Sequence, residues 1–369
     1  MPARLERSRT AGRWSGIWED LFDREAGPLA WPGYLFATIS RAEATTVCVA
    51  ADHTLMDGYS VFQIPYEIHT LYAAARAAEG SVLPLPPAPS YLDFAEAERT
   101  AADALTAQHP AIVCWQRFVS AGGGRLPPFP VTVSNADGGA DAQPGGYIEL
   151  LDASAARAFE RVCRDAGGDS FSGLLACFAR ASREIAGSHE FRTMVPFHTH
   201  TGARRSSIGW YVGMGPVAFP FEAADAFDEA VRSAVAGLKG VKELAQVPMS
   251  RVMELLGQPL RDPFMISYMD LRLVAGARNW ARWQTVALRS RSMDPDEVCL
   301  WIMRTHNGLC ISYRYPANDL AGVVVPRYVA RTKHLLACVA RTTHWPPPPS
   351  TQQERNVHDG HQTHCSSMS

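Results

Sequence analysis

The chain has 369 residues, of which 47% are hydrophobic and 20% charged. This is the composition of a globular protein with enough apolar material for more than one core, so we predict two lobes. The 35 Lys and Arg residues nearly balance the 37 Asp and Glu residues, which excludes the basic field of a nucleic-acid-binding or membrane-surface protein. No apolar run approaches the roughly 20 residues of a membrane span. The charged first residues differ from a signal peptide, and we predict a cytoplasmic protein.

The first predicted elements are two short strands, over residues 35–39 and 45–50, joined by a tight turn. The second is a run of β-branched and small apolar residues. The second strand contains no alternating polar residue, so we expect it to be buried on both faces. It leads directly into the most informative stretch of the chain.

In that stretch Asp52 and His53 follow the strand, and Asp57 and Gly58 come after three further residues. A strand end would hold the imidazole rigidly, and Gly58 provides backbone freedom in the turn that brings a carboxylate nearby. Because imidazole titrates near neutral pH, His53 is the candidate general base. The spacing alone has an ordinary alternative, a histidine that only packs at a strand end.

A helix is predicted to begin at Ser60, with Gln63 in the capping-box position, and to end near Gly80. Pro65 lies inside it, so an irregular opening turn is expected. The first backbone N–H groups of this helix could stabilise negative charge beside Asp57. The alternative is a helix that only packs on the sheet.

The remaining pattern alternates helices and strands. Periodicity and turn residues predict helices from residue 91 and over 111–119, 154–166, 170–185, 227–245 and 325–341, and strands over 147–151, 191–196, 264–269, 297–305 and 309–315. Ser154 and Ser170 are expected to cap their helices. Three glycines in the segment 207–216 predict bulges or a close approach of another part of the chain.

The glycine-rich stretch 121–124 lacks the lysine of a phosphate loop, so we interpret it as a linker between lobes. The predicted division is an N-terminal lobe over 1–125, a C-terminal lobe over 147–345 and a disordered tail over 346–369. The eight cysteines are predicted to be mostly buried free thiols, neither disulfides nor metal ligands. They are Cys48, Cys114, Cys163, Cys177, Cys299, Cys310, Cys338 and Cys365.

Three motifs together resemble a known family. Residues 52–58 resemble the His-His-x-x-x-Asp-Gly motif of the condensation-domain and chloramphenicol-acetyltransferase-like superfamily. Residues 91–95 resemble its Tyr-x-Asp-Phe-Ala motif, and residues 208–213 are similar to its Ile-Gly-x-Phe-Val-Asn segment. The finer similarity is to the polyketide-associated (Pap-type) acyltransferases that esterify trehalose-type glycolipids. It rests on Leu105-Thr106, Trp115, Gly123-Gly124, Leu126-Pro127, Phe129-Pro130 and the strand from Phe264 to Asp270.

This resemblance implies an α/β fold of two similar lobes around a central channel. An acyl thioester and a hydroxyl acceptor would meet at His53, which would take the acceptor's proton without an acyl-enzyme intermediate. Asp57 would hold the motif loop through an ion pair with an arginine that the sequence does not identify. The N–H of Gly58 is a candidate oxyanion donor. Trp210 and Tyr211 would line the channel.

Two further residues are channel candidates. Ser267 is a candidate polar contact, although an ordinary strand serine is the simpler interpretation. Asp52 stands where the superfamily motif has its first histidine. No metal site and no cofactor are expected, because the donor substrate would be an acyl-CoA or an acyl-carrier-protein thioester. The carrier protein is then a candidate partner.

The leading prediction is an acyltransferase that forms an ester in lipid, glycolipid or polyketide biosynthesis. Two alternatives stay open, an amide-forming condensation enzyme and a non-catalytic remnant that binds a carrier protein or another partner. Relatives have a longer N-terminal segment before the motif, so we expect an incomplete first lobe with exposed strand edges. A serine hydrolase is disfavoured, because no Gly-x-Ser-x-Gly segment occurs.

Overall fold

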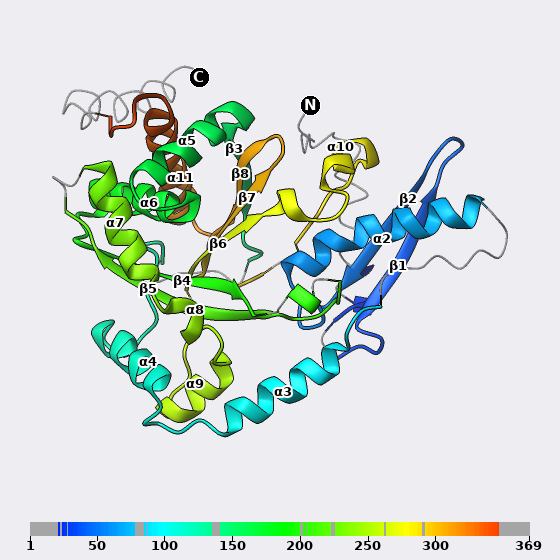
Figure 1. Ribbon diagram of the computed structural model, residues 1–369, viewed down its shortest axis with the longest axis horizontal. Helices are drawn as coiled ribbons and strands as arrows, with labels where there is room; N and C mark the ends of the chain where they lie inside the picture. Colours follow the sequence, from blue (N-terminus) through cyan, green and yellow to red (C-terminus); the bar gives the residue numbers. More distant parts are fainter. Residues whose placement is uncertain are drawn as a thin grey trace, which may run out of the picture.

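The computed structural model describes residues 21–22, 24–27, 29–77, 85, 87–134, 141–199, 202–204, 206–222, 226–261, 263–289 and 292–346. Within these residues the strands form two sheets, one of two strands and one of six. Figure 1 shows the small sheet and one long helix, in blue, on one side of the molecule, and the large sheet with most of the helices on the other. The predicted mixed α/β architecture with two lobes is therefore present.

The small sheet is the hairpin of β1 (Tyr34–Ser40) and β2 (Thr45–Ala51), which pair antiparallel as predicted. The prediction that the second strand is buried on both faces is wrong. Val47 is 45% exposed, and the residues of β1 alternate between exposed and half-buried. Side chains alternate between the two faces of a strand, so the exposed residues of β1 show that one face of the hairpin is open to solvent among the described residues.

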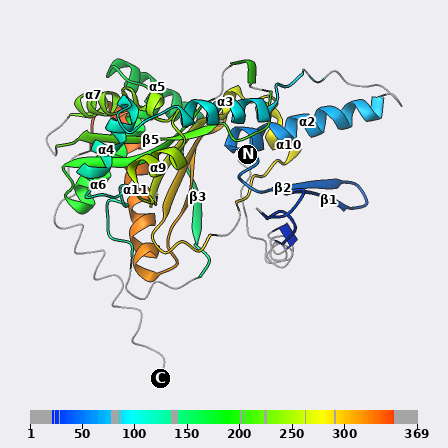
Figure 2. The same cartoon turned by 90° about the horizontal axis from the view of Figure 1, so that it is seen from below.

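Helix α2 (Gly58–Ala77) follows the motif and runs alongside the hairpin (Figure 2). It begins two residues before the predicted start, because the carboxylate of Asp57, and not Ser60, caps it. Asp57 Oδ1 accepts the backbone N–H of Ser60 at 2.8 Å. The helix continues through Pro65, and its residues after Ala77 lie outside the described part.

Five of the six strands of the large sheet agree with the predicted positions to within a few residues, and the strand over Val212–Pro220 was not predicted. The six strands are β3 (Gly145–Asp152), β4 (Glu190–His198), β5 (Val212–Pro220), β6 (Phe264–Asp270), β7 (Val298–Thr305) and β8 (Gly308–Arg314). Their order is β3-β8-β7-β6-β4-β5. β6 runs parallel to β4 and β7, and the other neighbours are antiparallel. The predicted hairpin around residues 306–308 is β7–β8.

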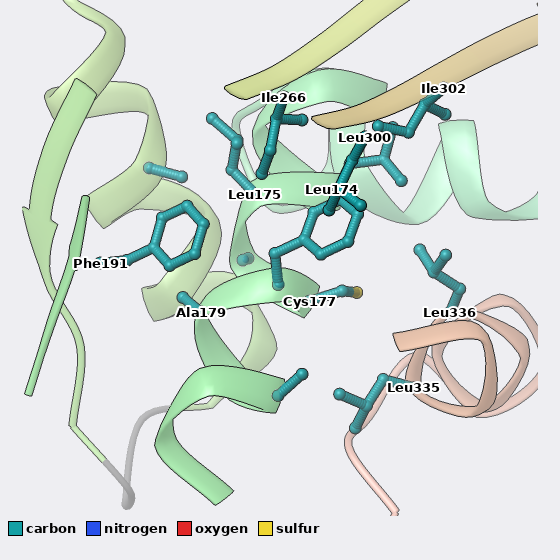
Figure 3. Close-up of a cluster of buried hydrophobic side chains, with 14 of the residues drawn as sticks. Leu174, Leu175, Cys177, Ala179, Phe191, Ile266, Leu300, Ile302, Leu335 and Leu336 are labelled. Carbon is teal, nitrogen blue, oxygen red and sulfur yellow. The ribbon is translucent and has the colours of Figure 1, made fainter. Parts of the chain in front are cut away.

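Helices cover one face of this sheet and build the main core. The helices of the C-terminal part are α5 (Ala153–Asp165), α6 (Ser170–Ala186), α7 (Phe227–Leu238), α8 (Val241–Leu244), α9 (Met249–Leu256) and α11 (Asp319–Thr342). Figure 3 shows how Ile266, Leu300 and Ile302 of the sheet meet α6 and α11. Since side chains alternate along a strand, the residues between them point to the opposite face. In Figure 2 the N-terminal lobe lies on that opposite side.

Several helix ends differ from the predictions because side-chain caps and glycines decide them. Asp152 and Asp169 cap α5 and α6, whereas Ser154 and Ser170 lie inside the helices. The predicted helix 227–245 breaks after Leu238, and Gly240 adopts a φ of +75° before α8 begins.

The predicted limit of the N-terminal lobe at residue 125 does not follow the packing. Helix α3 (Tyr91–Asp103) leads to α4 (Pro110–Ala121), and α4 packs on α8 and α9. The side chain of Trp115 is fully buried there, and its Nε1–H donates to the carbonyl of Leu244 at 3.4 Å. Helix α4 thus belongs with the C-terminal lobe. All of the predicted tail except Pro346 lies outside the described residues.

The cysteines within the described residues are free, as predicted. Five of them are buried: Cys163, Cys177, Cys299, Cys310 and Cys338. Cys114 is exposed and Cys48 is half-buried, so the described cysteines are mostly buried, as predicted. Cys365 lies outside the described residues.

Candidate active site

His53 lies in the turn between β2 and α2, and its side chain is open to solvent. Its Nδ1 is 2.8 Å from the carbonyl oxygen of Met56, and its ring stands edge-on to Trp210 with 5.0 Å between the ring centroids. A carbonyl oxygen only accepts hydrogen bonds, so Nδ1 carries the hydrogen in the neutral imidazole. The lone pair on Nε2 is then the one that can take a proton.

Asp52, the residue before it, shapes the same turn. Its Oδ1 accepts the backbone N–H of Thr54 at 2.9 Å and also the hydroxyl of Thr54. This is the local hydrogen bonding by which an Asp stabilises a turn. The structure therefore gives Asp52 a turn-forming role beside the imidazole.

Asp57 is almost completely buried, with 1% of its surface exposed. Beyond Ser60, its carboxylate accepts the backbone N–H of Tyr211 at 3.1 Å through Oδ2, and its own N–H donates to the carbonyl of Gly209 at 2.9 Å. Among the described residues its partners are thus backbone amides. The arginine ion pair that the family resemblance implied is not found there.

Ser60, in the first turn of α2, adds a second set of hydrogen bonds between the start of this helix and the segment around Gly209. Its hydroxyl donates to the carbonyl of Gly209 at 3.0 Å and accepts the N–H of Gly209 at 3.1 Å. A Cβ on Gly209 would lie 2.4 Å from the ring of Tyr91. The close approach predicted for the glycines of 207–216 is therefore confirmed at this position, and also at Gly213, where a Cβ would lie 1.6 Å from the carbonyl oxygen of Ala245.

Tyr211 joins the third motif to the other two. Its ring packs on Phe94 and Tyr91, with ring centroids 4.7 and 5.3 Å apart, and its hydroxyl donates to Ser207 at 2.7 Å. The side chain is only 1% exposed, so it packs in the interior and does not line an open channel as predicted. Burial, followed by the negative charge of Glu98, raises the pKa of Tyr91.

The start of α2 also contacts the large sheet. A Cβ on Gly58 would lie 2.9 Å from the sulfur of Met269 on β6. The first N–H groups of a helix have no acceptor within it, so the N–H of Gly58 can donate to a group in this turn. Ser267 lies two residues before Met269 in β6, so the two side chains are on the same face of the strand. Ser267 is 7% exposed. The sequence-predicted site residues therefore lie in three places. One group is in the turn around His53, Ser267 is on the sheet face next to that turn, and the segment before β5 puts Trp210 beside His53 and Tyr211 in the interior.

A segment that the sequence did not predict crosses from the large sheet to α2. It consists of η2 (Leu271–Leu273), η3 (Ala277–Asn279) and α10 (Trp280–Trp283), and Figure 1 shows α10 next to α2. We call residues 271–284 the strap. Its Trp280 lies 5.3 Å from Phe62 between ring centroids, and its Trp283 stacks on His69 at 4.4 Å. The signal in the sequence that could have indicated this helix is the spacing of Trp280 and Trp283, which are three residues apart and so lie on one face of a helix.

Ion pairs anchor the strap at the sheet. Arg272 pairs with Asp270 at 2.5 Å and with Glu160 of α5 at 3.0 Å. The buried Arg304 of β7 also pairs with Glu160, at 2.6 Å. Burial alone would raise the pKa of Asp270, but its hydrogen bonds from Arg272 outweigh that effect and lower it. The strap is therefore fixed at its start by charge and at its far end by aromatic packing.

The described residues contain neither a metal-binding cluster nor a membrane-spanning helix. No group of three or more His, Cys, Asp or Glu side chains there is arranged to hold a metal ion. None of the helices in that part of the chain is both long and apolar enough to cross a membrane.

The sequence and fold match proteins of known family. The condensation-domain family model matches residues 22–269. The chain is 28% identical to the acyltransferase PapA3 of Mycobacterium tuberculosis over 326 residues. The aligned region covers 85% of this chain and 68% of the relative. It is 28% identical over 325 residues to the trehalose-2-sulfate acyltransferase PapA2 of Mycobacterium bovis, over 84% of this chain and 67% of the relative.

A solved structure of a PapA2 acyl transferase superimposes with a TM-score of 0.80 at 25% identity, over 89% of this chain and 72% of that one. The neighbour thus shares both sequence and fold with the chain. The resemblance and the two-lobe fold inferred from the three motifs are confirmed. The chain belongs to the condensation-domain family and, like these relatives, it is an acyltransferase.

Proposed function

We propose that the protein transfers an acyl group from a thioester to a hydroxyl group, forming an ester in glycolipid biosynthesis, with His53 as the general base. The observation that carries this proposal is the orientation of the imidazole. The carbonyl of Met56 takes the Nδ1 hydrogen, so Nε2 has a lone pair for the proton of an acceptor hydroxyl.

The reaction then needs no covalent intermediate on the protein. The hydroxyl oxygen attacks the thioester carbonyl while Nε2 of His53 takes the hydroxyl proton. The resulting oxyanion would accept the N–H of Gly58 at the start of α2. The C–S bond breaks as the carbonyl re-forms, and the imidazolium returns the proton to the departing thiolate. The products are an ester and a free thiol.

The other groups have supporting roles in this proposal. Asp52 and Asp57 shape the turn that carries His53, and Trp210 limits where the imidazole can lie. The donor is an acyl-CoA or an acyl-carrier-protein thioester, and no further cofactor takes part. The names of the PapA2 relatives favour a trehalose-type sugar as the hydroxyl acceptor. We expect the protein to act in the cytoplasm.

The test is acyl transfer followed by mass spectrometry. The purified protein receives a panel of acyl-CoA donors with sugar alcohols and amines as acceptors, and His53→Ala is compared with His189→Ala. His189 is an exposed histidine of the C-terminal lobe that pairs with Glu222, so its replacement controls for loss of any imidazole. We expect an ester that His53→Ala abolishes and His189→Ala retains.

Other results would point to the alternatives. An amide product with the amines would identify a condensation-type enzyme. A folded protein that binds the donors and gives no His53-dependent product with any acceptor would identify a non-catalytic binding protein.

A further inference from the structure

The face of the large sheet that points away from the main core carries a polar and aromatic row next to the motif. Trp301 of β7 is half-buried and lies in register with Ser267 of β6 and Ser312 of β8. The next row, two residues further along these strands, contains Met269 and Met303, which pack with the start of α2. Two residues along a strand span about 7 Å. Trp301 is therefore close to the motif but outside the layer that α2 covers.

Two guanidinium groups converge on Trp301 from different segments. The guanidinium carbon of Arg289 lies 3.9 Å from the centroid of the indole ring, and that of Arg314 lies 5.5 Å from it. Arg289 follows the strap, and Arg314 is the last residue of β8. Attraction between a cation and an aromatic face helps to hold each guanidinium group over the ring.

The positive charge at this place exceeds the negative charge. Arg314 pairs with Glu297 at 2.5 Å through Nη2, and its Nε is buried without a hydrogen-bond partner in the described part of the chain. Arg289 donates to the hydroxyl of Ser312 at 3.3 Å, and no carboxylate of the described residues pairs with it. Glu297 therefore neutralises one of the two guanidinium groups and leaves the other.

The packing of the two guanidinium groups against Trp301 changes the pKa of Arg289. Desolvation of the guanidinium against the indole, followed by the charge of Arg314, lowers the pKa of Arg289 to about 10, although the residue as a whole remains exposed. It stays protonated at neutral pH. An anion that bound here would relieve the repulsion between the two arginines, and solvent exposure of Arg289 leaves the position accessible.

We propose that Arg289 and Arg314, held over Trp301, form a binding site for a tetrahedral oxyanion, a phosphate or sulfate ester, on one of the two substrates. This proposal rests on the proposed acyl transfer, because it assigns a charged group to a substrate of that reaction. The planar guanidinium forks suit two oxygens of such a group. The site lies on the sheet face that meets the motif, so the charged end of a substrate can be held here while its reacting end lies at His53.

The same oxyanion chemistry could come from either substrate, so the test has two arms. In the donor arm, adenosine 3′,5′-bisphosphate is compared with adenosine. In the acceptor arm, a sulfated disaccharide is compared with the same disaccharide without sulfate. Binding is measured by calorimetry on the His53→Ala protein, because that variant separates anion binding from turnover. The arm in which the charged probe binds more tightly than its neutral partner identifies the substrate that carries the anion.

Three variants at the site and one control variant elsewhere then assign the binding to this site. Arg289→Gln should weaken binding of the charged probe about tenfold, equivalent to roughly 1.4 kcal/mol, and Arg289→Lys should recover only part of it. Glu297→Gln removes the competing carboxylate and should strengthen binding. Arg157→Gln, at an exposed arginine of α5 on the helical side of the sheet, should change nothing.

The proposal is wrong if neither charged probe binds better than its neutral partner, or if Arg289→Gln binds it as tightly as Arg157→Gln does. Neither outcome bears on the proposed acyl transfer, which is measured separately on the protein with His53 intact. Loss of His53-dependent ester formation with binding retained would contradict the proposed function and leave the anion site standing.

Discussion

The carboxylate of Asp57 accepts the backbone N–H of Tyr211 at 3.1 Å, and the two residues are 154 positions apart in the chain. The other carboxylate oxygen takes the N–H of Ser60 at the start of α2. A single buried side chain thus joins the turn that carries His53 to the segment that enters β5. We infer that the position of the imidazole depends on this connection as much as on the turn itself.

Replacing Asp57 by Asn should therefore reduce both stability and acyl transfer. An amide NH₂ in place of one oxygen leaves a backbone N–H facing a donor, and such a buried unsatisfied group costs about 1–3 kcal/mol. Denaturant-induced unfolding measures the first effect and ester formation the second. Asp93→Asn, at an exposed position of α3, is the matched control. Equal unfolding midpoints for the two variants would contradict the role given to Asp57.

Ser60→Ala should destabilise the protein in the same range, about 1–3 kcal/mol. The variant removes the hydroxyl that is both donor and acceptor for Gly209 and leaves the N–H of that glycine without a partner. Ser154→Ala, at an exposed position in the first turn of α5, provides the comparison. Thermal unfolding compares the stability of the two variants. A Ser60→Ala protein as stable as Ser154→Ala would refute the prediction.

The strap should couple the two lobes energetically through its aromatic contacts. Phe62→Ala and Trp280→Ala each remove one ring of the pair whose centroids lie 5.3 Å apart. In a double-mutant cycle we expect a coupling energy of about 0.5–1.5 kcal/mol for this pair. Hydrogen exchange should also rise at the start of α2 in either variant. A coupling energy of zero would show that the strap lies on α2 without stabilising it.

Stability at acid pH should depend on Glu184, which lies between Arg180 of its own helix and Arg331 of α11. Burial alone would raise the pKa of this carboxyl group, but hydrogen bonds from Arg331 and Arg180 outweigh it and lower the pKa below its usual value of 4.5. The unfolded chain then binds this proton more readily than the folded one. The contribution of Glu184 is therefore present above about pH 4.5 and is lost as the pH falls through the lower, folded-state pKa.

Urea unfolding between pH 3 and pH 6 tests whether the contribution of Glu184 to stability is lost toward acid pH. The free energy of unfolding should fall toward acid pH in the wild type and fall less steeply in Glu184→Gln. Arg331→Gln should flatten the same part of the curve, because it removes one of the groups that lower the pKa. A steeper acid dependence in Glu184→Gln than in the wild type would contradict the assignment.

The sequence by itself determined the local elements and the chemical type of the site. Strand periodicity and turn residues located the hairpin of β1 and β2 and that of β7 and β8, because these signals depend only on neighbours along the chain. The order of the three motifs was sufficient to indicate the family. The spacing of His53 and Asp57 after a strand marked the candidate base, since that pattern is also local.

The tertiary structure decided what each of these residues does. It placed Asp57 against Tyr211, closed Ser60 on Gly209 and brought Trp210 beside His53. It also showed that the second strand is partly exposed, and it packed α4 on the C-terminal lobe. Each of these facts depends on residues far apart in the chain. Burial and hydrogen-bond partners are properties of the packed chain, whereas the pattern of a segment specifies only its own conformation.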